Sequence, residues 1–381
     1  MDAIQAPIIQ VIGQIIRQVP GTISLGQGVV HYGPPQAALD AAHDALADPV
    51  THEYQNGAGI EPLIAALGAK LQEENGINVA HGSRVMVTAG ANMAFMHAVF
   101  AVTQPGDEII LPVPFYFNHE MAIEMAACKA VRVPTDEHYQ LRIDALRAAI
   151  TPRTRAILTI SPNNPSGAVF TDASLRAVNA LCAERGIYHI TDEVYEYFTY
   201  GSAKHFSPAS MPGAEAHTIS MYSLSKAYGF AGWRIGYMVY PEHLASAMIK
   251  SQDTILVCPP VISQIAALAA LEVGRSHCEP HVRELAAIRT NVVTALSGLA
   301  PLAEVPAADG AFYVLLKVNT RHHPLALAER LICDHKVAVI PGPAFGMTDG
   351  CYFRVAYGAL QKETVTEGIG RLVKGLRRLC A

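Results

Sequence analysis

The sequence predicts an α/β protein in which a large domain is built on a mostly parallel sheet and a smaller domain is α+β. Two observations support this prediction. Between about residues 84 and 240, short β-branched runs alternate with longer helical patterns, an order that is typical of a parallel sheet. After about residue 275, a long helical pattern is followed by fewer and more widely spaced strands. We therefore expect a large domain over 45–275 and a small domain formed by 1–44 and 276–381.

Strands and helices are expected in the order in which their patterns occur. Seven strands are predicted in the large domain, at 84–88, 107–113, 130–134, 155–161, 187–191, 217–223 and 234–240, with helical patterns at 91–102, 117–127, 142–150 and 172–185. The small domain is expected to contain a long helix near 275–300, strands at 312–318, 337–341 and 352–357, and helices near 324–335 and at the C-terminus. At the start of the chain, Gln10 and Gln14 have the spacing of an amphipathic helix rather than of a signal peptide.

The composition excludes several classes of protein. Hydrophobic residues make up 51% of the 381 residues and charged residues 16%, which excludes disorder and implies an extensive core or a large subunit interface. The net charge is −5 and no segment gathers basic residues, so no nucleic-acid partner is expected. No apolar stretch reaches the roughly 18 residues of a membrane span. The seven cysteines form no C-x-x-C pair, so we expect no disulfide framework and no metal site, in a cytoplasmic protein.

The loops after the strands are the expected place for a ligand, because open α/β sheets bind at the carboxyl ends of their strands. After the first strand comes Ala89-Gly90-Ala91-Asn92, which opens a helix whose free N–H groups suit a phosphate. A tight packing turn is the alternative interpretation. Neither this turn nor Gly26-Gln27-Gly28 completes G-x-G-x-x-G, so a dinucleotide site is not supported.

Two further loops carry polar groups. Prolines and a glycine in 162–167 fix the backbone around Asn164, which is an amide donor. Asp192 and Tyr195 follow the fifth strand. These two residues have a simpler interpretation, in which Asp192 caps a helix and Tyr195 is a half-buried packing residue.

The sharpest signal is Lys226, one of only nine lysines, directly after the sixth strand. A buried lysine is costly unless its pKa falls or it forms an adduct, and an imine is the common chemical reason to keep one there. A lysine that reaches out to solvent is the alternative. Ser223, Ser225 and Arg234 lie close by in sequence and suit a phosphate.

Together, an imine-forming lysine, a phosphate cup, an acid for a pyridine nitrogen and a phenol for a ring hydroxyl specify pyridoxal 5′-phosphate. The motifs S-P-N-N-P-S-G, D-E-V-Y and S-L-S-K…G-W-R-I-G-Y occur in that order. Through them the chain resembles the class I/II aminotransferases of the aspartate aminotransferase superfamily, fold type I, over essentially its whole length. VMVTAGAN, PFYFN and GWRIGY make it most similar to the subgroup that acts on aromatic amino acids and methionine.

The resemblance implies roles for individual residues in a cofactor site of the large domain. Lys226 would form the imine and act as the base, Asp192 would contact the pyridine nitrogen, and Tyr195 and Asn164 would contact the ring oxygen. Tyr116 would stack on the ring. The phosphate would be held by Gly90, Ala91, Asn92, Ser223, Ser225 and Arg234, together with Tyr54 from the neighbouring subunit of a homodimer with shared sites.

The resemblance also implies how amino acid and 2-oxo acid substrates bind. Arg354, with Asn164 and Gly28, would hold the substrate carboxylate. The segment through His31 and Tyr32, where family members often have Asp-Phe, would fold over the substrate. His119 would support Asp192 or lie solvated on a helix.

Four functions fit these residues. The leading one is a transaminase that exchanges the amino group of an aromatic amino acid or methionine. The alternatives are an aspartate-type aminotransferase, a carbon–sulfur β-lyase with the same cofactor, and a regulator without activity. A second cation is not evident beside Arg354, although Arg17 is a candidate to swing in, and Asn92 stands where some acid-specific relatives have lysine. Tyr32, Phe115, Tyr116 and Phe345 are expected to form an apolar pocket for the substrate side chain.

Overall fold

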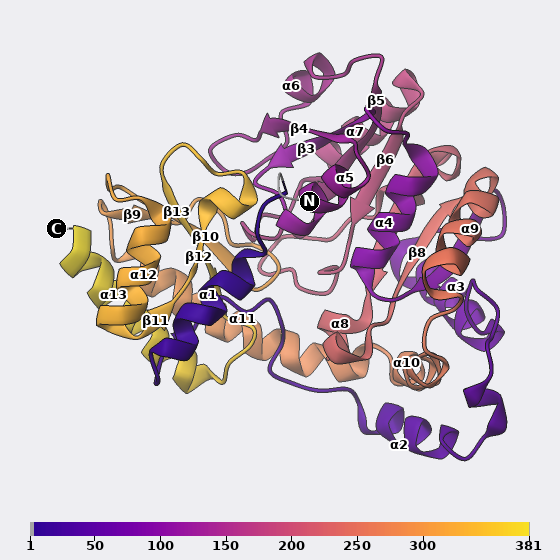
Figure 1. Ribbon diagram of the computed structural model, residues 1–381, viewed down its shortest axis with the longest axis horizontal. Helices are drawn as coiled ribbons and strands as arrows, with labels where there is room; N and C mark the ends of the chain where they lie inside the picture. The colour runs from indigo at the N-terminus through magenta and orange to yellow at the C-terminus, as the bar shows by residue number, and fades with distance from the viewer. Residues whose placement is uncertain (1–3, 381) are drawn as a thin grey trace.

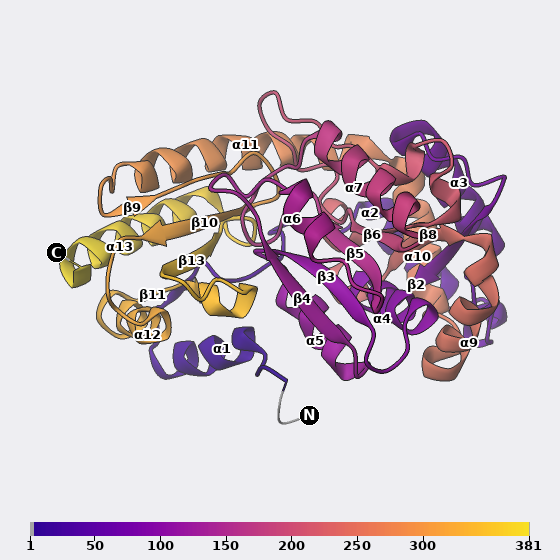
Figure 2. The same ribbon diagram turned by 90° about the horizontal axis from the view of Figure 1, so that it is seen from above.

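The computed structural model describes residues 4–380 and contains two main sheets that lie side by side (Figures 1 and 2). A seven-stranded sheet is formed by the middle of the chain, and a four-stranded sheet by its C-terminal part. Helix α11 (Arg275–Ser297) runs from one sheet region to the other along one side of the molecule (Figure 2). The predicted α/β class with a second, smaller sheet is confirmed.

The seven-stranded sheet has the order β2-β8-β7-β6-β5-β3-β4. Its strands are β2 (Ser83–Thr88), β3 (Glu108–Val113), β4 (Lys129–Pro134), β5 (Thr154–Ile160), β6 (Tyr188–Asp192), β7 (Thr218–Ser223) and β8 (Gly236–Pro241). All neighbours pair in parallel except β8, which is antiparallel to both β2 and β7. Each strand lies within two residues of a predicted one, because short apolar β-branched runs are a strong local signal.

Successive side chains of the strands enter different cores, as the period of two requires. Met86, Leu158 and Met221 point to one face, where α4 (Ala91–Val102), α5 (Phe117–Met125) and α9 (Ala245–Leu256) cover them. Ile110 and Ile157 point to the opposite face, under α6 (Ile143–Ala148) and α7 (Asp172–Arg185). Helices on both faces leave only the strand ends open for a ligand.

The four-stranded sheet has the order β12-β13-β10-β9 and is antiparallel. Its strands are β9 (Ala303–Glu304), β10 (Tyr313–Val318), β12 (Ile340–Pro341) and β13 (Cys351–Ala356), flanked by α12 (Pro324–His335) and α13 (Lys362–Cys380). The N-terminal segment joins this region: α1 (Ile8–Gln18) packs on α12, and β1 (Ile23–Ser24) pairs in parallel with β11 (Val337–Ala338).

Helix α2 lies with the large sheet rather than the small one. It covers Gln36–Ala45 and packs on α10 (Val261–Val273), far from α12 and α13 (Figure 1). Ala38 and Ala42 are buried in this contact region. We therefore propose a division into two domains whose first boundary precedes Gln36, earlier than the expected one at 44/45.

The remaining elements are short connections and helices that no predicted pattern covered. They are α3 (Glu61–Asn75), α8 (Leu224–Ala227) and the 3-10 helices Pro49–His52, Pro208–Ser210, Ala214–Ala216, Ala231–Trp233, Glu242–Leu244 and Gly342–Phe345. Among the helices of residues 4–380, none combines the length and the apolar character that crossing a bilayer requires.

Candidate active site

A cavity of about 300 Å³ lies between the two sheets, at the carboxyl ends of β5, β6 and β7. Twelve of the residues predicted from the sequence line it: Gly28, Ala91, Asn92, Tyr116, Asn164, Asp192, Tyr195, Ser223, Ser225, Lys226, Arg234 and Arg354. The N-terminal segment, the large sheet and β13 therefore all contribute residues to the lining of this one cavity. Gly90 lies immediately behind the lining, against Arg234.

Lys226 lies on the one-turn helix α8, which begins where β7 ends. The Ser223 hydroxyl caps this helix by accepting a hydrogen bond from the Ser225 N–H at 3.1 Å. The Lys226 Nζ donates to the carbonyl oxygen of Gly28 inside the cavity. Burial, reinforced by the Arg354 and Arg234 guanidinium groups, lowers the pKa of Lys226 to about 8. The interpretation of Lys226 as a surface lysine is therefore wrong, and its amine is partly neutral at physiological pH.

Asp192, at the end of β6, is 4% exposed and faces the cavity. His119 on α5 places its Nε2 3.2 Å from Asp192 Oδ2, and the Val194 N–H donates to Oδ1 at 3.3 Å. His119 is 2% exposed, so the alternative of a solvated helix histidine is wrong. The carboxylate is thus held in one orientation by groups that leave it facing the cavity.

Tyr195 is part of a short chain of polar groups. The Asn164 amide donates to the Tyr195 hydroxyl at 3.4 Å, and the hydroxyls of Tyr195 and Tyr313 lie 2.9 Å apart. Burial, followed by the neighbouring Tyr313, raises the pKa of Tyr195. Both phenols therefore stay protonated and act as hydrogen-bond donors or acceptors within the cavity.

Tyr313 is a lining residue that the sequence analysis missed. It lies on β10 and is completely buried, and burial raises the pKa of its phenol to about 12. The only local signal was a tyrosine at the start of an otherwise apolar strand. Other lining residues not predicted are Ile9, Gln27, Val29, Phe117, Val194 and Ala231.

One end of the cavity is rich in donors for an anion. Gly90, with φ of 81°, precedes α4, and a Cβ there would overlap the Arg234 guanidinium. Arg234 donates to the carbonyls of Ala231 at 2.9 Å and Ala89 at 3.3 Å and is otherwise exposed. The helical hydrogen bonds of α4 begin with the Met93 N–H, so the N–H groups of Ala91 and Asn92 precede them. With the hydroxyls of Ser223 and Ser225, this donor set suits a phosphate dianion.

The opposite end of the cavity is formed by Arg354 on β13, which is 2% exposed. Its Nη1 donates to Asn164 Oδ1 at 2.9 Å and its Nη2 to the carbonyl of Gly26 at 2.7 Å. The guanidinium lies 4.8 Å from the centre of the Tyr313 ring. Within residues 4–380, no carboxylate lies in ion-pair distance of Arg354, and its buried Nε has no partner. A buried cation without a counter-ion is prepared for an anionic ligand.

Three of the four aromatic residues expected to surround a substrate side chain do not line the cavity. The hydroxyl of Tyr32 instead donates to the backbone carbonyl oxygen of Lys226 at 3.1 Å, outside the cavity lining. Phe115 packs in the core under α4, and Phe345 lies behind Arg354, 5.0 Å from its guanidinium carbon. Only Tyr116 of the four lines the cavity, and its neighbour Phe117 does so as well.

Tyr54 stands apart from the cavity and is 82% exposed. Other apolar side chains of this region are exposed too: Leu46, Val50, Ile255 and Val257. Gly57 lies against the backbone of Val257, so the two parts of this exposed surface are close together.

Pyridoxal 5′-phosphate fits the residues present. The phosphate donors lie at one end, Lys226 lies in the middle, and Asp192 and the Asn164–Tyr195 pair offer partners for a ring nitrogen and a ring oxygen. The absence of a side chain at Gly90 leaves room for Arg234 beside the phosphate donors. A volume of about 300 Å³ is in the range of small-molecule sites.

The chain is similar to known proteins over nearly its full length. The profile of the family "Aminotransferase class I and II" matches residues 20–372. Aromatic aminotransferase ISS1 of Arabidopsis thaliana is 35% identical, over 98% of this chain and 94% of that protein. An aspartate aminotransferase of Pyrococcus abyssi is 32% identical, over 99% of this chain and 97% of that protein. The crystal structure of Pyrococcus protein-A1 is similar with a TM-score of 0.94 and 32% identity, covering 99% of this chain and 97% of that chain.

Proposed function

The chain belongs to the class I and II aminotransferase family, and from this premise we propose that its preferred amino donor is an L-amino acid with an aromatic side chain, or methionine. Membership makes the chain a pyridoxal-phosphate-dependent amino-acid aminotransferase of fold type I, with amino acids and 2-oxo acids as substrates. The names of the relatives include aromatic and aspartate aminotransferases, and they do not favour a carbon–sulfur lyase.

The observation that carries the substrate proposal is the distribution of charge in the cavity. Within the part of the chain that the structure describes, its cationic lining residues are Lys226, Arg234 and Arg354. Lys226 is the residue to which the cofactor attaches, Arg234 binds the cofactor phosphate and Arg354 binds the substrate α-carboxylate. No cation is left for a carboxylate on the side chain, and burying one unpaired is costly. Ile9, Val29, Tyr116 and Phe117 supply apolar and aromatic surface instead.

Each residue role follows from its contacts. Pyridoxal phosphate, when bound, supplies an aldehyde that accepts the amino group and an electron-withdrawing ring that acidifies the substrate α-hydrogen. Lys226 Nζ, with a pKa of about 8, can take that proton and return it at near-neutral pH. Asp192, held by His119, keeps a pyridine nitrogen protonated. Arg354 orients the α-carboxylate through its guanidinium and so fixes which bond faces the ring.

A homodimer with shared sites is part of the proposal. Tyr54 is 82% exposed and lies on a surface with Leu46, Val50 and Val257, which are apolar and exposed. Such a patch is typical of a subunit interface, and Tyr54 would reach the partner subunit's phosphate. Mixing Tyr54→Phe and Lys226→Ala proteins tests this: restored activity after subunit exchange supports shared sites, and no restoration after confirmed exchange contradicts them.

A cytoplasmic location is also proposed. All seven cysteines are free, and most are buried. Free thiols are typical of a reducing compartment.

The substrate proposal is tested by a series of amino donors with one fixed 2-oxo acid. We expect kcat/KM for phenylalanine, tyrosine, tryptophan or methionine to exceed that for aspartate by about 5- to 150-fold, because a side-chain carboxylate would lack about 1–3 kcal/mol of compensation. Asn92→Lys adds a cation to the lining and should raise kcat/KM for aspartate, whereas the neutral control Asn92→Gln should not. A wild-type preference for aspartate would contradict the proposal without affecting the assignment as an aminotransferase.

A further inference from the structure

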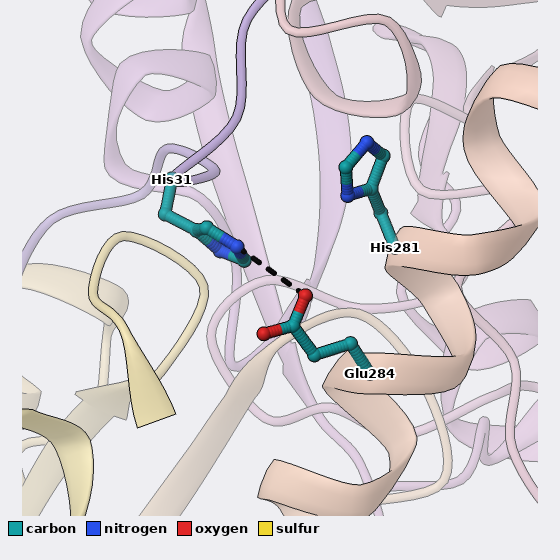
Figure 3. Close-up of side chains that lie close together, drawn as sticks. All are labelled: His31, His281 and Glu284. Carbon is teal, nitrogen blue, oxygen red and sulfur yellow. Dashed lines mark ion pairs between the residues drawn. The ribbon is translucent and has the colours of Figure 1, made fainter. Parts of the chain in front are cut away.

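Outside the cavity, two histidines and a glutamate from distant parts of the chain converge on one point. His31 lies in the segment before α2, and His281 and Glu284 lie on α11 (Figure 3). We propose that His31, His281 and Glu284 form a binding site for a divalent transition-metal ion of the zinc type. Neither amino-group transfer nor cofactor binding uses these three side chains.

The distances suit a single ion. His31 Nε2 and Glu284 Oε2 are 3.5 Å apart, and one ligand atom of each of the three residues lies within 4.8 Å of the other two. Two ligands of one tetrahedral zinc ion lie about 3.4 Å apart, since each is about 2.1 Å from the ion. The His31–Glu284 pair already has this separation, and a ligand atom of His281 lies within 4.8 Å of both. Because His281 and Glu284 are three residues apart on a helix, both point to the same side.

The hydrogen bonding of His31 favours a cation at this point. Its Nδ1 lies 3.4 Å from the carbonyl oxygen of Gly358, which can only accept, so Nδ1 carries the proton. In the neutral ring Nε2 then presents a lone pair to the carboxylate of Glu284. Two acceptors then face each other, and a cation between them, either a proton or a metal ion, satisfies both. A backbone carbonyl that holds the distal nitrogen is the usual arrangement behind a metal-binding histidine.

The ring of His281 is also held in place. Tyr32 stacks on it with a centroid distance of 3.7 Å and an interplanar angle of 6°. The side chain of His31 is 10% exposed and that of Glu284 is 41% exposed, so an ion can enter from solvent. Two imidazoles and one carboxylate with an open fourth position match zinc chemistry, whereas magnesium and calcium prefer sites made of oxygen alone.

Occupancy of this site would fix the segment that passes behind the cavity. Gly28 accepts a hydrogen bond from the Lys226 side chain, and Tyr32 donates to the Lys226 backbone. His31 lies between these two contacts, so an ion that joins it to α11 would anchor the segment. We therefore expect the ion to raise the thermal unfolding temperature of the protein.

The experiment is a titration of the cofactor-loaded protein with Zn²⁺ in competition with a chromophoric chelator. We expect one ion per chain at this site. His31→Ala, His281→Ala and Glu284→Gln should each weaken Zn²⁺ binding. The loss should exceed the roughly 10- to 100-fold caused by removing a residue that only hydrogen-bonds to a metal ligand. His277→Ala is the matched control, because His277 lies one turn away on α11 but outside the cluster, and it should bind Zn²⁺ as the wild type does. Mg²⁺ and Ca²⁺ should not compete.

Two further measurements make the result decisive. Anomalous diffraction at the zinc edge should give a peak between the three side chains, and cofactor absorbance should show that each variant is folded and loaded. If Zn²⁺ does not bind, or if Glu284→Gln and His31→Ala bind it as tightly as the wild type, the three residues form an ordinary ion-pair cluster and the proposal is wrong.

Discussion

The two ends of the cavity hold their anions in different ways. At one end Arg234 is exposed and is held only by backbone carbonyls beside a helix N-terminus. At the other end Arg354 is 2% exposed, donates to Asn164 and Gly26, and lies between aromatic rings. The exposed arginine shares its anion with many donors, whereas the buried one acts nearly alone in a site of low dielectric constant. We expect the buried arginine to matter more, and for the substrate rather than the cofactor.

The largest effect is expected at Lys226, which belongs to neither end. Lys226→Ala removes both the attachment point and the base, so turnover should fall by at least about 10⁴-fold. Both ends remain intact, so the protein should still bind pyridoxal phosphate without a covalent link. Steady-state kinetics measures the loss of turnover. The absorbance of the denatured protein shows whether the cofactor is still covalently attached. Lys250→Ala, at an exposed position of α9, is the control and should be fully active; substantial turnover in Lys226→Ala would contradict the assignment.

Arg354→Lys tests the buried end. Lysine keeps the charge but loses the planar fork that contacts Asn164, Gly26 and a carboxylate at once. We expect a loss of about 2–3 kcal/mol of transition-state binding, a fall in kcat/KM of about 30- to 150-fold. Cofactor affinity should stay the same. A variant with wild-type kcat/KM would mean that charge alone is sufficient and that the comparison between the two ends is wrong.

Arg234→Gln tests the exposed end. Because the side chain is solvated and shares the phosphate with other donors, affinity for pyridoxal phosphate should fall by only about 5- to 30-fold. The thermal unfolding temperature of the cofactor-free protein should barely change, since the residue packs against little. Equilibrium titration measures the affinity for pyridoxal phosphate, and calorimetry measures the thermal unfolding temperature. If Arg234→Gln lost more affinity for the cofactor than Arg354→Lys loses in kcat/KM, the exposed arginine would matter more than the buried one and the comparison would be wrong.

The smallest effect is a pH dependence that reports on both ends. Burial and the charges of Arg354 and Arg234 lower the pKa of Lys226 to about 8, and the neutral amine is the form that reacts with an aldehyde. The rate at which cofactor-free protein captures pyridoxal phosphate should therefore rise about tenfold between about pH 7 and pH 9 and then level off. An ordinary lysine would give a steeper rise that continues beyond that range. In Arg354→Gln the plateau should move to higher pH, and more so than in Arg234→Gln.

The elements of the large sheet were predictable because their signal is local. Short apolar β-branched runs mark β2 to β8, and the run 91–102 coincides with α4. The same local signal predicted that Lys226, Asp192 and Asn164 line a ligand site, since each lies at or shortly after the end of a strand. The antiparallel direction of β8 and the packing of α2 on α10 were not visible, because they depend on contacts between distant segments.

Tyr313 shows why part of the site could not be predicted. It enters the cavity only because β10 pairs with β13, which sets Leu315 opposite Arg354. Nothing near residue 313 in the sequence indicates that partner. Likewise Tyr32, Phe115 and Phe345 are aromatic and close to motif residues in sequence, but packing turns them away from the cavity. Proximity in sequence predicted the polar residues at strand ends better than the apolar walls.

The pairing of the N-terminal segment with the C-terminal sheet has a consequence for how the protein is made. The hydrogen bond from Arg354 to Gly26 joins residues 328 positions apart, and β1 lies beside β11. During synthesis on the ribosome, α1 and β1 emerge first, but their partners emerge only when the chain is almost finished. The seven-stranded sheet can form earlier from its own contiguous stretch. The carboxylate end of the cavity is therefore assembled last, so a nascent chain that stops short of β13 has Lys226 and its surroundings but no means of orienting a substrate.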